Sequence, residues 1–418
     1  MERMQVYYEG QAVGTLAVAR GGIFFEYSRE FIATGHELSP LRLPLGPGVR
    51  ARDTVPTMRL PGLFEDSLPD RWGQRLMLEW FRRHGQSSYD VTPLMMLAYV
   101  GRRAMGALTY EPERTVEPAD GLTGGVSLAV LHEAAERIER MTASGSPGEV
   151  DADLAMLARA GTSAGGARPK ALIGVPGRET QGTRPVIGGE NLPAGYEAWM
   201  VKFDTSDDGS AGPVEEAYAR MARAAGIDMP ATRLLETRHA DGQVRRHFAV
   251  KRFDREDGGR IHHHTLAGMC HMEGGDLDYG ILLRVTRQIT RDEREVWRVW
   301  RRAVFNVLVS NRDDHGKNHG FIYHAREWHP GPAYDLTFAS PTRLPERGMA
   351  VAGERREAGV EHLLMLAKAE GLEARRAAGI IDEVRDVVAR WNEFANEAGV
   401  PAIKAAEVEG ALRRIRNA

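Results

Sequence analysis

The sequence predicts an α+β fold in which two strand-rich regions precede a largely helical C-terminal region. Short runs of alternating apolar and polar residues, broken by glycine, fill the first region, and apolar runs bounded by turn residues fill the second. From about His262 onward the spacing of apolar residues is mostly helical. A chain of 418 residues is longer than most single cores, so we expect more than one subdomain.

The composition is that of an ordinary soluble globular protein, with 42% hydrophobic and 27% charged residues. The formal net charge is −3, so no overall charge attracts the chain to nucleic acid or to an anionic membrane. The chain contains neither an apolar run of about 18 residues nor the apolar core of a signal peptide. Cys270 is the single cysteine, which fits a reducing cytosol. We therefore expect a cytoplasmic protein with no membrane contact.

Residues 1–112 form the first predicted subdomain, which is rich in β-strand. The segments MQVYYEG, AVGTLAVA and GGIFFEYS alternate apolar and polar positions and predict an antiparallel meander. The segments RWGQRLMLEWFRRHG and TPLMMLAYVG are expected to be helices, the first ending at Gly85. Residues 113–150 are expected to be a linker with one helix, because stretches rich in Pro, Gly and acidic residues flank residues 128–141.

Residues 151–255 form the second strand-rich region, with strands predicted at ALIGV, PVIGG, EAWMVKFD, TRLLET and HFAVKRFD. The segment VEEAYARMARAAG interrupts them as a helix, with Gly226 at its C-terminal cap. Residues 256–418 are predicted to form the helical region. A strand-rich lobe followed by a helical lobe is the layout of a bilobal kinase, although many other folds share it.

The most informative segment is NRDDHGKN at residues 311–318, directly after the apolar run VFNVLVS. Phosphoryl transfer needs a carboxylate that orients the attacking hydroxyl and oxygen ligands that hold Mg²⁺. In kinase catalytic loops these groups are an Asp and an Asn five positions apart, which is the spacing of Asp313 and Asn318. A second metal carboxylate should follow, and the segment PAYDLTFAS supplies Asp335. This spacing predicts a phosphoryl-transfer site.

The second strand-rich region offers matching groups for ATP. Lys202 in EAWMVKFD lies where a strand lysine would hold the phosphates, and Glu216, with Glu215 as the alternative, is the candidate carboxylate partner on the next helix. The glycine-rich segment GTSAGGARPKALIG precedes this strand, and its backbone N–H groups can approach phosphates closely. The chain order of these parts is that of a kinase that uses ATP and Mg²⁺.

Each of these residues also has an ordinary structural explanation. A glycine-rich segment is more often a plain turn than a phosphate loop, and a strand lysine is usually solvated. Asp313 and Asp314 are common turn residues, and Asp335 is a common helix cap. None of these explanations predicts the joint order of the parts, so the kinase interpretation is favoured.

At these residues the chain resembles the HipA family, and the resemblance covers nearly the whole sequence. The segment GTSAGGARPKAL resembles the family's Ser-x-x-Gly-Ala-x-x-Lys phosphate loop, and NRDDHGKNHGF is similar to its Asp-x-His-x-Lys-Asn catalytic loop. YDLTFAS resembles the metal-binding Tyr-Asp segment, VKRFDR the inter-lobe segment, and FEDSLPDRWGQRLM the Leu-Pro-Asp segment of the amino-terminal subdomain. The resemblance implies a bilobal protein-kinase-like fold with an extra β-rich amino-terminal subdomain and a helical C-lobe.

The resemblance also implies roles for individual residues. Asp313 would be the catalytic base, with His315 and Lys317 shaping the loop and meeting the transferred phosphate, and Asn318 and Asp335 would bind Mg²⁺. Ser163 matches the serine that family members autophosphorylate, a modification that ejects the phosphate loop and switches the kinase off. The residues implied to bind ATP are Ser163, Ala164, Gly165, Gly166, Ala167, Lys202, Glu216, Arg252 and Phe253.

What the resemblance implies about function is a serine/threonine-protein kinase that acts as the toxin of a toxin–antitoxin system. Family members phosphorylate a protein, in known cases an aminoacyl-tRNA synthetase, and a small helix-turn-helix antitoxin, HipB-like, restrains them. That antitoxin binds operator DNA, so we expect DNA contact only through it. The chain departs from the family at His263, His264 and Thr265, where acidic residues are usual. The role of residues 262–264 stays open, because adjacent histidines point in different directions and do not easily share one metal ion.

Two other classes of function remain open. A small-molecule or phosphoinositide-like kinase would share the Asp-x-His-x-x-Asn pattern of Asp313, His315 and Asn318, but no amphipathic stretch for docking to a membrane is evident. An inactive kinase-fold regulator in an antitoxin complex would be expected to lack active-site residues, whereas Lys202 and Asp335 are also present.

Overall fold

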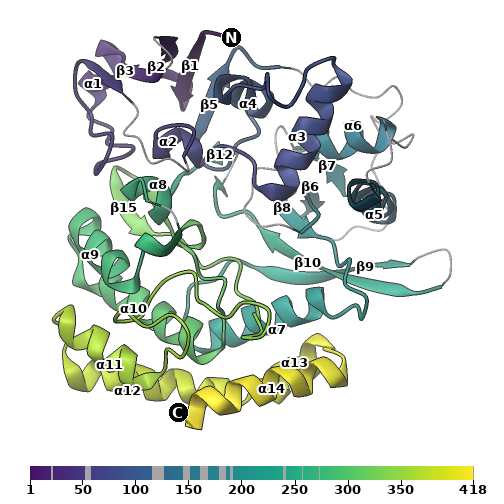
Figure 1. Ribbon diagram of the computed structural model, residues 1–418, viewed down its shortest axis with the longest axis vertical. Helices are drawn as coiled ribbons and strands as arrows, with labels where there is room; N and C mark the ends of the chain where they lie inside the picture. Colours follow the sequence, from purple (N-terminus) through teal and green to yellow (C-terminus); the bar gives the residue numbers. More distant parts are fainter. Residues whose placement is uncertain are drawn as a thin grey trace. The chain divides into compact units, whose positions relative to one another are not determined.

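The computed structural model describes residues 1–19, 22–51, 58–114, 127–144, 151–160, 168–177, 185–188, 192–238, 242–256, 258–272 and 274–417. The chain divides into two compact units (Figure 1). Unit 1 consists of Met1–Thr205 and Arg233–His262, and unit 2 consists of Ser206–Thr232 and His263–Ala418. Part of the predicted linker, at residues 115–126 and 145–150, lies outside the described residues.

The amino-terminal part of unit 1 contains the predicted meander as part of a five-stranded sheet with the order β4-β3-β2-β1-β5. Alternate residues of the first strand, Met4, Val6 and Tyr8, are buried, which is the periodicity that the sequence shows. The antiparallel pairing of the first three strands confirms the predicted meander. The strands are β1 (Arg3–Tyr8), β2 (Gln11–Ala19), β3 (Gly22–Tyr27), β4 (Val49–Ala51) and β5 (Leu108–Glu111).

Four helices accompany this sheet, and the third, α3, begins directly after Asp70. Asp70 caps its N-terminus by accepting a hydrogen bond of 2.8 Å from the backbone N–H of Gly73. Its apolar face, which includes Trp72 and Phe81, is buried, and Gly85 follows its end with a left-handed φ of 77°. The helices are α1 (Arg29–Thr34), α2 (Gly62–Glu65), α3 (Arg71–Arg83) and α4 (Pro93–Val100).

The rest of unit 1 is built on a second five-stranded sheet with the order β7-β6-β8-β10-β9. Six of the seven residues of its β6 strand are buried, so the strand reads as a continuous apolar run rather than an alternation. Helix α6 packs against α5 and α3. The elements are α5 (Leu128–Ser144), α6 (Asp151–Arg159), β6 (Lys170–Pro176), β7 (Val186–Ile187), β8 (Tyr196–Lys202), β9 (Thr232–Arg238), β10 (Val244–Lys251), and the hairpin of β11 (Arg255–Glu256) and β12 (Gly259–Arg260).

Unit 2 is mostly helical, as predicted for the C-terminal region, and α10 lies at its centre in contact with α9, α12 and α14. The helices are α7 (Ala211–Ala224), α8 (Leu266–Cys270), α9 (Tyr279–Thr290), α10 (Glu293–Leu308), α11 (Val360–Ala369), α12 (Ala374–Val388), α13 (Trp391–Ala398) and α14 (Ala402–Asn417). The short helices η1 (Gly274–Asp276) and η2 (Gly316–Asn318) and a small sheet of β13 (His262–Thr265), β14 (Gly320–His324) and β15 (Glu327–Pro330) complete the unit. The mixture of sheets and helices confirms the α+β class.

Helix α7 differs from the sequence-based division, because it lies within the segment predicted for the strand-rich lobe but belongs to unit 2. It packs against α12 and α13. Tyr218 donates a hydrogen bond of 2.7 Å to the carbonyl of Val309, and its ring meets that of Trp391 edge-on at 5.6 Å. The buried face of the helix therefore finds its core among the C-terminal helices.

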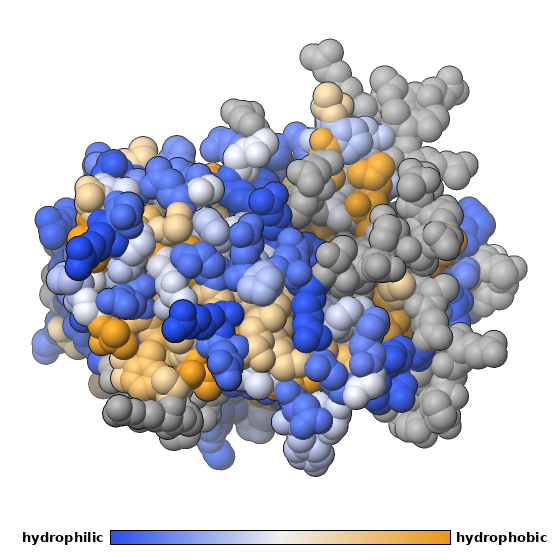
Figure 2. Space-filling view, turned by 90° about the horizontal axis from the view of Figure 1, so that it is seen from above, coloured by the Kyte–Doolittle hydropathy of each residue, from blue (hydrophilic) through white to orange (hydrophobic). Residues whose placement is uncertain are grey.

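Hydrophilic side chains cover most of the described surface on the face shown in Figure 2, and apolar side chains form small groups there. Within the part of the chain that the structure describes, no helix is long and apolar enough to cross a membrane.

Candidate active site

The loop between α10 and β14 brings the predicted base and the predicted metal ligand together. After α10 the chain turns at Ser310, whose left-handed φ is 54°, and continues to η2. The side-chain Nδ2 of Asn318 donates a hydrogen bond of 2.7 Å to the backbone carbonyl of Asp313. The two ends of the five-residue spacing are thus joined, as the sequence predicts.

The electrostatic surroundings of Asp313 suit a proton acceptor. Loss of hydration among neighbouring protein atoms raises the pKa of its carboxyl above the ordinary value, although 60% of the side chain is exposed. His315, whose Nε2 lies 3.8 Å from the carboxylate, and Arg343 oppose this rise. The carboxylates of Asp335 and Asp314 add to it. The charge of Asp335 is thus one of those that act on the Asp313 carboxylate.

Asp335 has a left-handed backbone, with a φ of 57° that is unusual for a residue other than glycine. Its neighbours hold this conformation in place, since Ala333 and Leu336 are buried. Tyr334 donates a hydrogen bond of 2.7 Å to the carbonyl of Lys317, which ties the segment to the catalytic loop. Strained backbone of this kind costs about 1–3 kcal/mol and gathers at functional sites. The conformation therefore supports a functional role for Asp335.

A buried ion pair lies beneath the catalytic loop, and sequence reasoning missed it. Asp314 is fully buried and accepts hydrogen bonds of 2.7 Å from the Tyr279 hydroxyl and 2.6 Å from the Arg347 guanidinium. The backbone N–H of Gly348 donates to the other oxygen at 3.1 Å. The Tyr279 hydroxyl in turn accepts a hydrogen bond of 3.0 Å from the amide of Asn306. Every oxygen of the buried carboxylate is thus satisfied, which its burial requires.

Arginine side chains also bind the loop through its main chain. Arg347 donates hydrogen bonds to the carbonyls of Asn306 at 3.0 Å and of Asn311 at 2.8 Å. Arg312 donates in the other direction, to the carbonyls of Leu344 at 2.7 Å and of Arg356 at 2.7 Å. The catalytic loop and residues 344–356 therefore hold each other in place.

Glycine is required where this segment touches the loop. A Cβ atom on Gly348 would lie 2.4 Å from the backbone nitrogen of His315. A Cβ atom on Gly316 would lie 2.2 Å from a methyl group of Leu277. The contact at Gly348 is with backbone atoms, so a larger residue there would shift the backbone, whereas at Gly316 the Leu277 side chain would have to move. Gly348 therefore fixes the path of the loop.

His319 lies under the loop and remains neutral. Burial, followed by the positive charge of Arg302, lowers the pKa of this histidine to about 3. Its ring meets that of Tyr279 edge-on at 5.6 Å. The histidine therefore adds no charge beneath the catalytic carboxylates at neutral pH.

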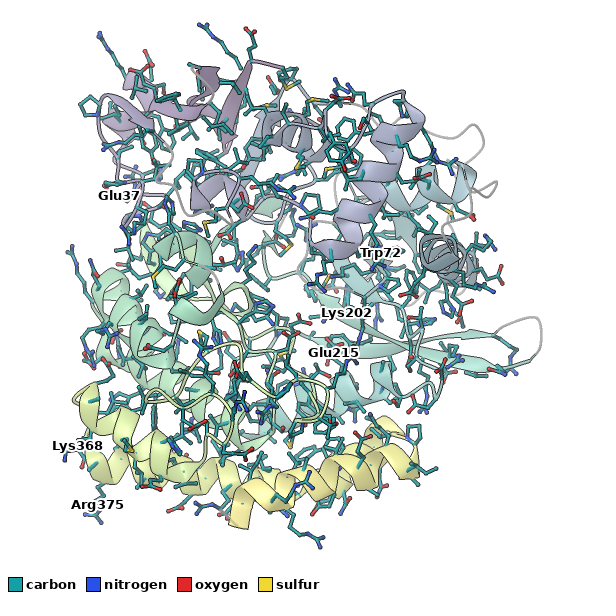
Figure 3. The ribbon with its side chains drawn as sticks, viewed as in Figure 1. Glu37, Trp72, Lys202, Glu215, Lys368 and Arg375 are labelled. Atoms are coloured by element: carbon teal, nitrogen blue, oxygen red, sulfur yellow. The ribbon has the colours of Figure 1, made fainter. Side chains whose placement is uncertain are left out.

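In unit 1, Lys202 ends strand β8 and is labelled in Figure 3. Its side chain is buried, and its Nζ lies 5.7 Å from the centre of the Phe248 ring. In the sheet it stands directly opposite Lys170 on one side and Phe248 on the other. The glycine-rich first part of the predicted phosphate loop lies outside the described residues, and with it Ser163, Ala164, Gly165, Gly166 and Ala167.

Glu216, the predicted carboxylate partner of Lys202, is bound within its own helix. Its carboxylate accepts a hydrogen bond of 2.7 Å from Arg220, one turn further along α7. Glu215, the alternative that the sequence offered, is buried as well and is labelled in Figure 3. The sequence could have predicted this pair, since Glu and Arg four residues apart on a helix form ion pairs. Both carboxylates therefore stay candidates for the partner of Lys202.

Arg252 and Phe253 follow strand β10, and the Arg252 side chain is bound to protein groups. Its guanidinium donates to both oxygens of buried Asp254, at 2.9 Å and 2.7 Å, while its backbone N–H donates to the carbonyl of Ala198 at 2.8 Å. Asp254 also accepts from the N–H of Gly106 at 2.7 Å. Phe253 is half-buried. The guanidinium of Arg252 therefore holds the inter-lobe segment on the loop of the amino-terminal subdomain.

The run of three histidines divides between different surroundings. His262 shares a hydrogen bond of 2.9 Å with the carbonyl of Leu38. In unit 2, the His263 ring lies 5.8 Å from that of Tyr334, and His264 is fully buried.

Models of two protein families match the chain. The model of the HipA N-terminal domain matches residues 4–111, and that of the HipA-like C-terminal domain matches residues 162–391. Two candidate kinases of Sinorhizobium fredii (strain NBRC 101917 / NGR234) are related to it. Y4mE is 29% identical over 198 residues, which cover 42% of this chain and 46% of that protein. Y4dM is 30% identical over 168 residues, which cover 37% of this chain and 41% of that protein. The matches thus span less than half the length of these relatives.

Among solved structures, the fold is similar to a chain of the Shewanella oneidensis MR-1 toxin–antitoxin complex of HipA, HipB and operator DNA. The TM-score is 0.69 at 17% sequence identity, and the alignment covers 99% of this chain and 96% of that one. The likeness supports the α+β fold over its whole length. Because the C-terminal family model alone matches more than half of the sequence, the chain belongs to the HipA family.

Proposed function

We propose that the chain is an ATP-dependent kinase that transfers the γ-phosphate to a serine or threonine hydroxyl of a protein. The observation that carries the proposal is the joined pair of Asp313 and Asn318, with the segment that carries Asp335 tied to the same loop by the hydrogen bond from Tyr334 to Lys317. Phosphoryl transfer needs a proton acceptor and metal ligands in such an arrangement. The raised pKa of Asp313 makes it a stronger base toward a hydroxyl proton.

The donor atoms present fit a magnesium ion. Mg²⁺ prefers oxygen ligands and often takes one or two from carboxylates. The amide nitrogen of Asn318 is committed to the carbonyl of Asp313, so its amide oxygen is the atom that remains for a cation. Asp335 would supply the carboxylate. A bound magnesium ion would offset the negative charge of the ATP phosphates.

Other residues of the chain would bind and orient ATP. We propose that Lys202 and the segment from Ser163 to Ala167 hold the phosphates, and that Arg252 and Phe253 lie near the adenine. His315 and Lys317 would shape the loop and meet the transferred phosphate.

The regulation and partners follow from membership of the family. We propose that Ser163 is autophosphorylated and that the added charge, about −1.5 to −2, repels the nucleotide phosphates. The solved Shewanella complex contains HipB and operator DNA, which supports a HipB-like antitoxin as a partner of this chain and DNA contact through that antitoxin. The target would be a cytoplasmic protein, with an aminoacyl-tRNA synthetase as the first candidate.

Intact-mass measurement after incubation with Mg²⁺ and ATP tests this proposal. We expect the wild type to gain one phosphate and the Ser163→Ala and Asp313→Asn variants to gain none. A wild type that starts unmodified, gains no phosphate and labels only a lipid or a sugar alcohol would favour a small-molecule kinase. A wild type that turns over no ATP at all would favour an inactive regulator.

A further inference from the structure

The Leu-Pro-Asp segment of the amino-terminal subdomain meets the strand that follows the predicted phosphate loop. The carboxylate of Asp70 forms an ion pair with the ammonium of Lys170, 100 residues further along the chain. The Lys170 side chain is 1% exposed and that of Asp70 is 10% exposed. A second link joins the same elements, since the indole N–H of Trp72 donates a hydrogen bond of 3.2 Å to the carbonyl of Lys170. Helix α3 is thus tied to β6 by a side chain and by the main chain.

Lys170 is the direct neighbour of Lys202 in the sheet. The two residues stand opposite each other in the antiparallel pairing of β6 and β8. Residues opposite each other in this way point to the same face, with Cβ atoms about 5 Å apart. Two like charges at that distance oppose each other. Of the two lysines, Lys170 is the one that lies beside α3, and Asp70 supplies an opposite charge to it.

We propose that Asp70 is a positioning residue for nucleotide binding, which holds the first residue of β6 beside Lys202. The inference rests on the proposed function, because it takes Lys202 as a ligand of the ATP phosphates. Removal of the Asp70 charge would take a carboxylate from the buried ammonium of Lys170, which destabilises the ammonium where it is. Lys170 would reach water only if the start of β6 shifted. Because Lys202 is paired with Lys170 in the sheet, that shift would also move Lys202. The amino-terminal subdomain thereby becomes part of the nucleotide-binding apparatus.

The two carboxylate oxygens of Asp70 do different work, which makes a selective variant available. One oxygen caps α3 by accepting from Gly73 N–H at 2.8 Å, and the other binds Lys170. Asparagine caps a helix about as well as aspartate does, so Asp70→Asn removes the charge and keeps the cap. Glu79→Gln is the matched control, because Glu79 forms ion pairs on the same helix with Arg82 at 2.5 Å and Arg83 at 2.7 Å.

Calorimetric titration with Mg²⁺ and a non-hydrolysable ATP analogue, with the melting temperature of each variant, tests the inference. We expect Asp70→Asn to bind about tenfold more weakly and Glu79→Gln to match the wild type within about twofold. A merely structural role would lower the melting temperature and leave the affinity of the folded protein unchanged. Equal or tighter binding by Asp70→Asn would overturn the inference alone, whereas no binding by the wild type would overturn the proposed function and this inference together.

Trp72→Phe keeps the test decisive if Asp70→Asn does not fold. This change keeps an aromatic ring at the buried position, although a smaller one, and removes the hydrogen bond to the Lys170 carbonyl. We expect about threefold weaker binding from the loss of one hydrogen bond. Unchanged affinity in Trp72→Phe, with Asp70→Asn unfolded, would overturn the inference.

Discussion

The predicted catalytic loop of unit 2 and the sheet of unit 1 that carries Lys202 fix their candidate functional residues in different ways. In the loop, Asp313 and Asn318 are close in sequence and are joined directly, while arginine side chains bind the surrounding main chain. In the sheet, Lys202 takes its place from strand register, and its neighbour Lys170 is paired with Asp70 from another subdomain. The comparison teaches that a loop can carry its chemistry in a short motif, whereas a strand residue depends on distant partners.

The largest expected effect comes from Asp313→Asn, which breaks the loop's chemistry without changing its size. We expect kcat for phosphoryl transfer to fall about 10³-fold, because the amide cannot take the hydroxyl proton. Affinity for ATP should be nearly unchanged. The matched change in the sheet, Lys202→Met, should weaken ATP binding instead. Steady-state kinetics and calorimetric titration of both variants separate the two effects, and an Asp313→Asn variant with wild-type kcat would contradict the assignment.

Arg347→Met breaks the support of the loop. Removal of one partner of a buried ion pair leaves the Asp314 carboxylate uncompensated, and we expect a loss of about 3–5 kcal/mol in the free energy of unfolding. Urea titration of the variant measures this loss. A change below about 1 kcal/mol would show that the pair does not hold the loop.

The neutral His319 predicts a pH dependence of stability that arises beneath the loop. Its pKa is lowered to about 3 in the folded protein, whereas the unfolded chain binds this proton near pH 6.5. The unfolded state therefore binds more protons between these values, and the free energy of unfolding falls as the pH drops below 6.5. The expected contribution is about 2 kcal/mol between pH 7 and pH 5. Urea titrations of wild type and His319→Phe at both pH values should show a smaller loss in the variant, and an equal loss would contradict the assignment.

The smallest effect is expected from Arg356→Ala, in the same segment as Arg347. The Arg356 side chain is 69% exposed, and its ion pair with Glu346 spans 3.0 Å at the surface. Exposed pairs contribute less than about 1 kcal/mol, so stability should change little. Urea titration beside Arg347→Met checks this, and a loss as large as that of Arg347→Met would show that the exposed pair also supports the loop.

The sequence predicts what local patterns encode and misses what distant contacts decide. Alternation in β1 and the cap signals around α3 are visible in single segments, and the five-residue spacing brings Asp313 and Asn318 together within one loop. No local pattern links Asp314 to Arg347, 33 residues later, or Asp70 to Lys170. Each of these pairs is made only when the chain folds.

For the partner of Lys202 and for the side chain of Arg252, the sequence alone did not hold enough information. Glu216 and Glu215 are adjacent and both buried on α7, and the hydrogen bond from Arg220 to Glu216 does not decide which of them pairs with Lys202. Arg252 was expected near the adenine, and only the folded structure shows that its guanidinium binds Asp254. Buried polar groups require partners, and those partners come from the tertiary structure.

Incubation of the purified protein with a cell extract, Mg²⁺ and γ-labelled ATP tests the central claim most directly. We expect the wild type to label a discrete protein band on serine or threonine and the Asp313→Asn variant to label none. Equal labelling by the two proteins, or label that enters only lipids and small metabolites, would contradict the claim that this chain is a protein kinase with Asp313 as its base.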